Sequence, residues 1–199
     1  MLAIASGSLA AVQGGAVGPP VLGRSFDVEV TRGVVRVKPK GSKVFGPLTR
    51  PEQLAFGSWI DATNGEVRIT SAADAAGTAH AARFYAGKFR IFQADRPGAF
   101  TEIRLEGGDF RPCGQAGAAR TEGVRRKTPI RRVWGNGKGM FRTVGRSSSA
   151  AVVGTVWLTE DRCDGTLTRV RSGTVRVRDF ARHRTVILEA GDAYLAAPR

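Results

Sequence analysis

The chain has 199 residues, 42% of them hydrophobic, which excludes a wholly disordered protein and leaves room for one core or two small lobes. Lysine and arginine number 31 against 17 aspartate and glutamate, so the net charge is +14 at pH 7. A charge of this size favours binding to polyanions but does not indicate a fold. The 26 glycines often lie between short Val, Ile and Phe runs, which is typical of strands joined by tight turns.

The first segment, residues 1–23, reads MLAIASGSLAAVQGGAVGPPVLG and is apolar, rich in small residues and broken by Gly-Pro-Pro. It is too short and too rich in glycine for a membrane span of about 20 apolar residues, so we predict no transmembrane segment. It resembles the hydrophobic and cleavage regions of a secretory signal, although no basic residue precedes the apolar run. We therefore expect an export signal or a disordered tail, and export would give an extracytoplasmic location, secreted or at the cell surface.

Residues 24–111 form the first predicted β half, because hydrophobic residues recur there with a period of two. The segments that alternate are FDVEV (26–30), GVVRVKPKG (33–41), GEVRIT (65–70), GKFRIF (87–92) and TEIRLEG (101–107). Asn64-Gly65 is a strong signal for a tight turn. The alanine-rich segment 71–87 is compatible with helical turns and equally with an extended chain.

Residues 112–132 have no hydrophobic period and are rich in glycine, alanine and basic residues, which predicts a flexible basic linker. The wider window 111–146 holds ten basic residues and one acid, so it supplies +9 of the net charge. Five cations within eight residues make this segment a candidate anion site, although a solubilising linker would have the same composition. The cations are Arg125, Arg126, Lys127, Arg131 and Arg132.

Residues 133–199 form the second predicted β half. The alternating segments are GTVWLTED (154–161), TLTRV (166–170), TVRVRD (174–179) and TVILEAG (185–191). Asp164-Gly165 predicts a tight turn, and we interpret Ser172-Gly173 as a second hairpin turn. That hairpin would place Arg169 opposite Arg176, where an anion could relieve their repulsion, although a solvated strand face is the simpler interpretation.

These patterns predict an all-β protein of short, stacked antiparallel strands with little helix. The strands would form either a two-sheet sandwich or a short module like a β-solenoid.

The order and spacing of these segments are similar to those of a known protein family. The second half reads GTVWLTEDRCDGTLTRVRSGTVRVRDF and then TVILEAG, and the first half reads GVVRVKPKGSKVFGPL and then LAFGSWIDATNGEVRITSA. This resembles the FecR-like domain, the extracytoplasmic β module of ferric-citrate-type regulators, over residues 30–197. The helical segment that grips a sigma factor and the membrane helix are not recognisable, so sigma-factor control is not carried over.

The resemblance implies an exported, non-catalytic structural or protein-interaction module, with a protein partner at a sheet edge or face. The alternative is a basic polyanion-binding protein that acts through residues 125–132. Its ligand would be a cell-wall polymer, a lipid headgroup or nucleic acid, of which nucleic acid is the least expected because no nucleic-acid-binding motif accompanies the cations.

The two cysteines, Cys113 and Cys163, form no CxxC or Cys/His cluster, so no zinc site is predicted. In an exported protein they would form one disulfide, whereas in a cytosolic protein they would be free thiols.

No residue is predicted to be catalytic, and no cofactor or metal is expected. His80 and His183 lack a nucleophile or carboxylate signature nearby, and EDRCDG (160–165) lacks the ligand pattern of a calcium loop. Trp59 and Trp157 are expected to fill the core.

Overall fold

The structure is a computed structural model that describes residues 18–114 and 127–198. Within these ranges thirteen strands form one hydrogen-bonded sheet, and the predicted signal-like segment 1–23 lies mostly outside them. The strands are β1 (Ser25–Lys38), β2 (Gly46–Pro47), β3 (Glu52–Ala55), β4 (Trp59–Ala72), β5 (Ala79–Tyr85), β6 (Lys88–Phe92), β7 (Thr101–Leu105), β8 (Arg131–Gly137), β9 (Phe141–Val144), β10 (Ser148–Arg162), β11 (Gly165–Asp179), β12 (Arg184–Leu188) and β13 (Ala193–Ala196). One short 3-10 helix, η1 (Arg111–Gly114), interrupts them.

The all-β prediction with little helix is therefore confirmed, and the alanine-rich segment 71–87 contributes the end of β4, a turn and all of β5. The prediction of short strands is wrong for β1, β4, β10 and β11, which have 14 or 15 residues each. The pairing is also not purely antiparallel, because β7 and β9 run parallel.

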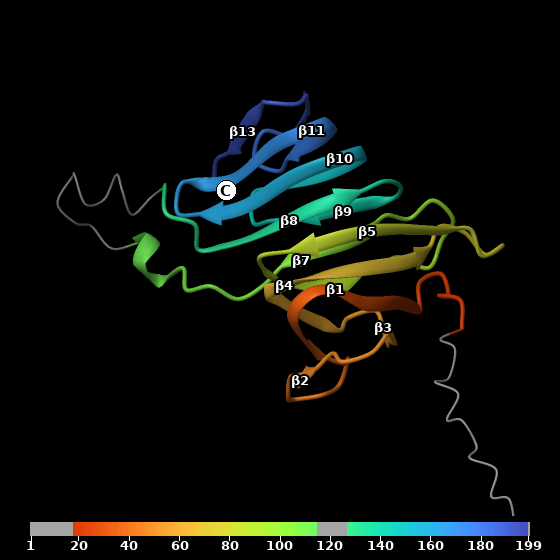
Figure 1. Ribbon diagram of the computed structural model, residues 1–199. Helices are drawn as coiled ribbons and strands as arrows, with labels where there is room; N and C mark the ends of the chain where they lie inside the picture. The colour runs from red at the N-terminus through yellow and green to blue at the C-terminus, as the bar shows by residue number, and fades with distance from the viewer. Residues whose placement is uncertain (1–17, 115–126, 199) are drawn as a thin grey trace, which may run out of the picture.

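The four long strands change neighbours half-way along, and this folds the sheet over on itself. The start of β4 pairs with β6 and its end pairs with β5, while the start of β10 pairs with β9 and its end pairs with β8. The pairings consequently close a ring through β10, β8, β5, β4, β6, β7, β9 and back to β10. Figure 1 shows the strands stacked, with β11 and β13 at one end and β2 and β3 at the other.

Glycines make the long strands possible where they bend. Asn64 and Gly65 form no turn, contrary to the prediction, because they lie inside β4, where Gly65 is directly opposite Gly33 of β1. A Cβ at Gly33 would lie 2.3 Å from the Asn64 carbonyl oxygen, and φ of Gly33 is +70°. The glycine signal is thus real, but it marks a close approach of two backbones rather than a chain reversal.

The predicted hairpin at Ser172-Gly173 is wrong for the same reason. β11 continues through both residues, and a Cβ at Gly173 would lie 2.3 Å from the Gly154 carbonyl oxygen of β10. The true reversal between these strands is the turn at Cys163-Asp164, where Arg162 pairs with Gly165. The prediction of a turn at Asp164-Gly165 is therefore correct to within one residue.

Aromatic rings fill the space enclosed by the folded sheet. Phe84 contacts Phe89, Phe141 and Trp157, with ring centroids 5.7–6.0 Å apart. Trp157 is fully buried, as expected, and its indole N–H donates to the Thr143 hydroxyl at 3.0 Å. Trp59 is only partly buried and lies on the outside of the sheet, so the prediction that it fills the core is wrong.

Candidate functional site

A basic surface covers the outside of one part of the sheet, and strand alternation creates it. In β6, Phe89 and Ile91 are fully buried, so Lys88, Arg90 and Phe92 point outward. The same alternation applies in the second half of β1, the first half of β4, β7, β9, the first half of β10 and the second half of β11. We call this surface the basic face. Its strand cations are Arg36, Lys38, Lys88, Arg90, Arg104, Arg142, Arg176 and Arg178.

Two carboxylates lie among these eight strand cations, so the described strand residues of the basic face carry a net charge of about +6. Asp61 is 3.2 Å from the Lys88 ammonium, and Glu102 is paired with both Arg104 and Arg142. Burial raises the pKa of Glu102, but the hydrogen bonds from Arg142 and Arg104 outweigh it and hold the pKa below its ordinary value. Both carboxylates are therefore charged at neutral pH, and most of the cations still have no acidic partner among the residues that the structure describes.

Aromatic side chains contact several cations of the basic face. The Lys38 ammonium lies 4.4 Å from the Trp59 ring centroid and 5.3 Å from that of Phe45. The Arg90 guanidinium lies over both Trp59 and Phe92, and that of Arg104 lies 4.3 Å from the Phe92 centroid. Cation–π contacts of this kind restrict the side chains without neutralising them. The result is a set of charges that is partly ordered before any ligand arrives.

The structure disperses the anion-binding residues predicted from the sequence. Arg125 and Arg126 lie outside the described residues, and Lys127 is exposed. Arg132 is exposed on the other outer surface, opposite Glu160 in the register. Arg169 and Arg176 belong to the same strand and are not paired with each other, so the predicted charge opposition is wrong. Of these residues, Arg176 alone is a strand residue of the basic face, as far as the described positions show.

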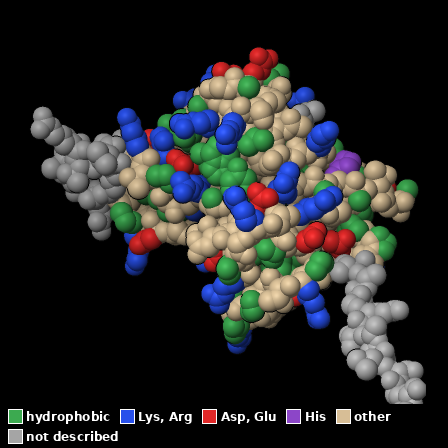
Figure 2. Space-filling view, viewed as in Figure 1, with side chains coloured by type: hydrophobic (Ala, Val, Ile, Leu, Met, Phe, Trp, Pro, Cys, Tyr) green, Lys and Arg blue, Asp and Glu red, His purple; other side chains and the backbone are tan. Residues whose placement is uncertain are grey.

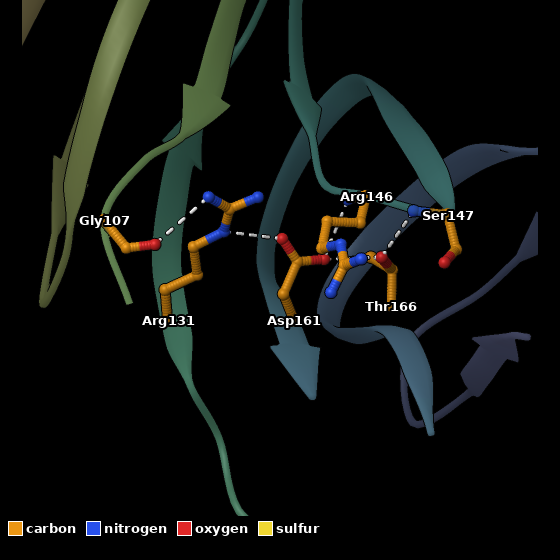
Figure 3. A network of polar contacts seen from close by, with 6 residues as sticks. All are labelled: Gly107, Arg131, Arg146, Ser147, Asp161 and Thr166. Atoms are coloured by element: carbon orange, nitrogen blue, oxygen red, sulfur yellow. Dashed lines mark hydrogen bonds and ion pairs between the residues drawn. The ribbon is translucent and has the colours of Figure 1, made fainter. Parts of the chain in front are cut away.

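Arg131 is withdrawn from any ligand by an internal ion pair (Figure 3). Its Nε donates to a carboxylate oxygen of Asp161 at 2.8 Å, and its Nη1 donates to the Gly107 carbonyl at 3.2 Å. The other Asp161 oxygen accepts from the Thr166 hydroxyl at 2.5 Å and from the Arg146 backbone N–H at 3.0 Å. Asp161 is fully buried, so this network joins β8, β10, β11 and the preceding loops rather than presenting a reactive group.

A disulfide joins Cys113 to Cys163, which confirms the predicted pairing. It connects η1 to the turn between β10 and β11. Phe110 is held beside it, with the guanidinium groups of Arg146 and Arg131 at 4.2 and 5.1 Å from its ring centroid. The segment that leads into the predicted linker is therefore fixed to the sheet at Cys113.

Asp179 caps the end of β11 from a fully buried position. Burial raises its pKa, but hydrogen bonds from the Tyr194 hydroxyl and from the Arg182 backbone and guanidinium outweigh this and hold the pKa at about 2, below the ordinary 3.8. A lowered pKa means that the carboxylate stabilises the fold above about pH 4 and that this contribution is lost as the pH falls towards 2.

We therefore expect Asp179→Asn to lower the free energy of unfolding by about 1–3 kcal/mol at pH 7, because charge-assisted hydrogen bonds are lost. Urea unfolding of both proteins between pH 7 and pH 2 measures the effect. The difference should shrink below pH 4; a difference that stays constant down to pH 2 would contradict the role given to the charge.

A hollow of about 590 Å³ on the other outer surface is lined by small and polar residues together with Arg68, Arg83 and Lys138. No acid, histidine or cysteine is among its described lining residues. Figure 2 shows one side of the molecule, where lysine and arginine side chains are scattered and hydrophobic side chains gather near the middle.

Over residues 18–114 and 127–198, no group of three or more His, Cys, Asp or Glu residues could hold a metal ion. Within the same ranges no helix is long and apolar enough to cross a membrane. Comparison of the chain with protein-family models, curated proteins and solved structures found no match.

Sequence reasoning missed most of the basic face. The signal was present as basic residues alternating with buried ones, in RVK (36–38), KFR (88–90) and RVR (176–178). Each stretch looks like an ordinary solvated strand, and only the strand order brings them onto one surface.

Proposed function

We propose that the protein is an extracytoplasmic, non-catalytic binding module whose basic face holds an anionic polymer. The observation that supports this is the gathering of eight cations and two carboxylates on one outer surface of the sheet. A surface of one charge sign raises the local concentration of oppositely charged ligands and speeds their association. The ligand would be held by Arg and Lys contacts to its anionic groups.

The extracytoplasmic location rests on the disulfide. Disulfides persist in oxidising compartments and are rare where thiols are kept reduced. The pair Cys113–Cys163 and the signal-like residues 1–23 point in the same direction.

A second candidate keeps the protein partner implied by the FecR-like resemblance. β12 lies at the end of the sheet order, and its Ile187 is 63% exposed. An edge strand with an exposed apolar side chain is suited to pairing with a strand of another protein. In that case the partner would be lost on replacing Ile187 by lysine and kept when the basic face is neutralised.

The polymer proposal is tested by removing charge from the basic face. The variant carries Arg36→Gln, Arg176→Gln and Arg178→Gln, whose side chains are exposed and have no carboxylate partner among the described residues. Polyphosphate is titrated against this variant and against the native protein at several salt concentrations. At about 0.1 M salt the variant should bind roughly tenfold or more weakly than the native protein. The magnitude of the slope of log K against the logarithm of the salt concentration should be smaller in the variant by about two to three.

The matched control removes the same charge from the other outer surface, through Arg68→Gln, Arg169→Gln and Arg171→Gln. Unchanged folding of both variants is checked by thermal unfolding. Equal losses in the two triple variants would mean that net charge alone drives binding, and the proposal would fail. A third variant, with Arg125, Arg126 and Arg132 replaced by glutamine, tests the predicted linker. If only this variant loses polyphosphate binding, the binding site lies in the linker and not on the basic face.

A further inference from the structure

The basic face is much longer across the strands than along them. In one row the register aligns Lys38, Trp59, Arg90 and Arg104, from β1, β4, β6 and β7. The neighbouring row aligns Glu102, Arg142, Ala151 and Arg176, from β7, β9, β10 and β11. The two rows overlap at β7 and together cross seven neighbouring strands.

The dimensions follow from sheet geometry. Six steps between neighbouring strands, at roughly 4.8 Å each, give a length of about 29 Å across the strands. On β1, β6 and β11 two cations are separated by one residue, as in Arg36 and Lys38, which is about 7 Å, and β7 and β9 carry one cation each. A stripe of this shape matches a single extended chain and not a broad flat surface such as a membrane.

The aromatic residues of the stripe are engaged already. Trp59 is contacted by Lys38 and Arg90, Phe92 by Arg90 and Arg104, and Phe45 by both Lys38 and Lys88. Proteins that bind single-stranded nucleic acid instead stack bases on free aromatic faces. Here the rings serve to position cations, and a ligand is not required to carry aromatic groups.

From this geometry we infer that the ligand is a linear polymer with repeating phosphate or carboxylate groups on a non-aromatic backbone, which lies across the strands from β1 to β11. This inference rests on the proposed function. The guanidinium groups of Arg90, Arg104, Arg142 and Arg176 would donate to successive anionic groups of the polymer, with Lys38 at one end of the stripe.

The length of the ligand provides the test. Four polyphosphate chains are titrated against the whole protein, with extended lengths of about one third, two thirds, one and two times the length of the stripe. We call them the short, intermediate, matched and long chains. Affinity should rise steeply from the short chain to the matched chain and then level off, apart from the small gain from additional binding registers.

Substitutions at the two ends of the stripe sharpen this test. Lys38→Gln and Arg176→Gln should each weaken binding of the matched chain. Together they should abolish the gain in affinity between the intermediate and the matched chain, because the anionic groups at the two ends of the ligand would then lack their cations. The short chain should be affected much less, since it can bind at the middle of the stripe.

Two outcomes separate this inference from the proposed function. If the short chain binds as tightly as the matched chain, while the triple variant of the basic face still loses binding, the site is compact and the stripe is wrong. If no polyphosphate binds at all, the proposed function fails as well.

Two further probes test the chemical class. Oligothymidylate with the same number of charges should bind no more tightly than polyphosphate. Trp59→Leu should not weaken the binding of oligothymidylate more than it weakens the binding of polyphosphate. Tighter binding of oligothymidylate that depends on Trp59 would overturn the inference in favour of single-stranded nucleic acid. Tighter binding to anionic phospholipid vesicles than to the matched chain would overturn it in favour of a membrane surface.

Discussion

Replacing Cys113 and Cys163 by serine is expected to lower the free energy of unfolding by about 4 kcal/mol. The two cysteines are 50 residues apart, and a cross-link of that separation removes much of the conformational freedom of the unfolded chain. The bond also joins η1 to the turn between β10 and β11, which no strand pairing between these two parts would otherwise connect.

Urea unfolding of the double variant and of the native protein, each with and without dithiothreitol, measures this loss. Reduction should bring the native protein down to the stability of the variant and leave the variant unchanged. Polyphosphate binding should persist in the folded variant, because the disulfide is near Arg162 and Gly165, away from the half of β11 that carries Arg176. If reduction leaves the native stability unaltered, the cross-link does not stabilise the fold.

The strand segments could be predicted from the sequence because alternation is a local property. Phe26 and Val28, or Val175 and Val177, are buried as their period of two requires. Turns were harder to predict. Cys163-Asp164 reverses the chain, whereas Asn64-Gly65 and Ser172-Gly173 have the same local chemistry and lie in continuous strands. Each of these glycines is required because a backbone segment that is distant in sequence lies close to it, and local sequence patterns do not contain that information.

The candidate site was missed for a related reason. Basic residues are densest in the sequence near the linker, and this density predicts an anion site at Arg131 and its neighbours. In the structure Arg131 is paired with an aspartate 30 positions away, while the basic face collects one or two cations from each of several strands. Charge density along the chain and charge density on the surface are different quantities, and strand order connects them.

The ion pair of Arg131 leads to the second large effect. Asp161→Ala is expected to destabilise the protein by about 3–5 kcal/mol, because it leaves a largely buried guanidinium without its partner. The side chain of Arg131 is only 17% exposed, and the same substitution removes the acceptor for Thr166 and for the Arg146 backbone N–H. Denaturant midpoints at pH 7 measure the loss.

A double-mutant cycle separates the ion pair from the rest of the network. Arg131→Leu alone leaves Asp161 with the Thr166 and Arg146 donors, so its cost should be smaller than that of Asp161→Ala. The double variant should be more stable than the sum of the two single losses predicts, because no unpaired charge remains. Asp109→Ala, which removes a half-exposed carboxylate paired with the exposed Arg111, is the matched control and should cost much less than Asp161→Ala. Strict additivity in the cycle would show that the Arg131–Asp161 ion pair has no coupling energy, and the stabilising role given to this pair would be wrong.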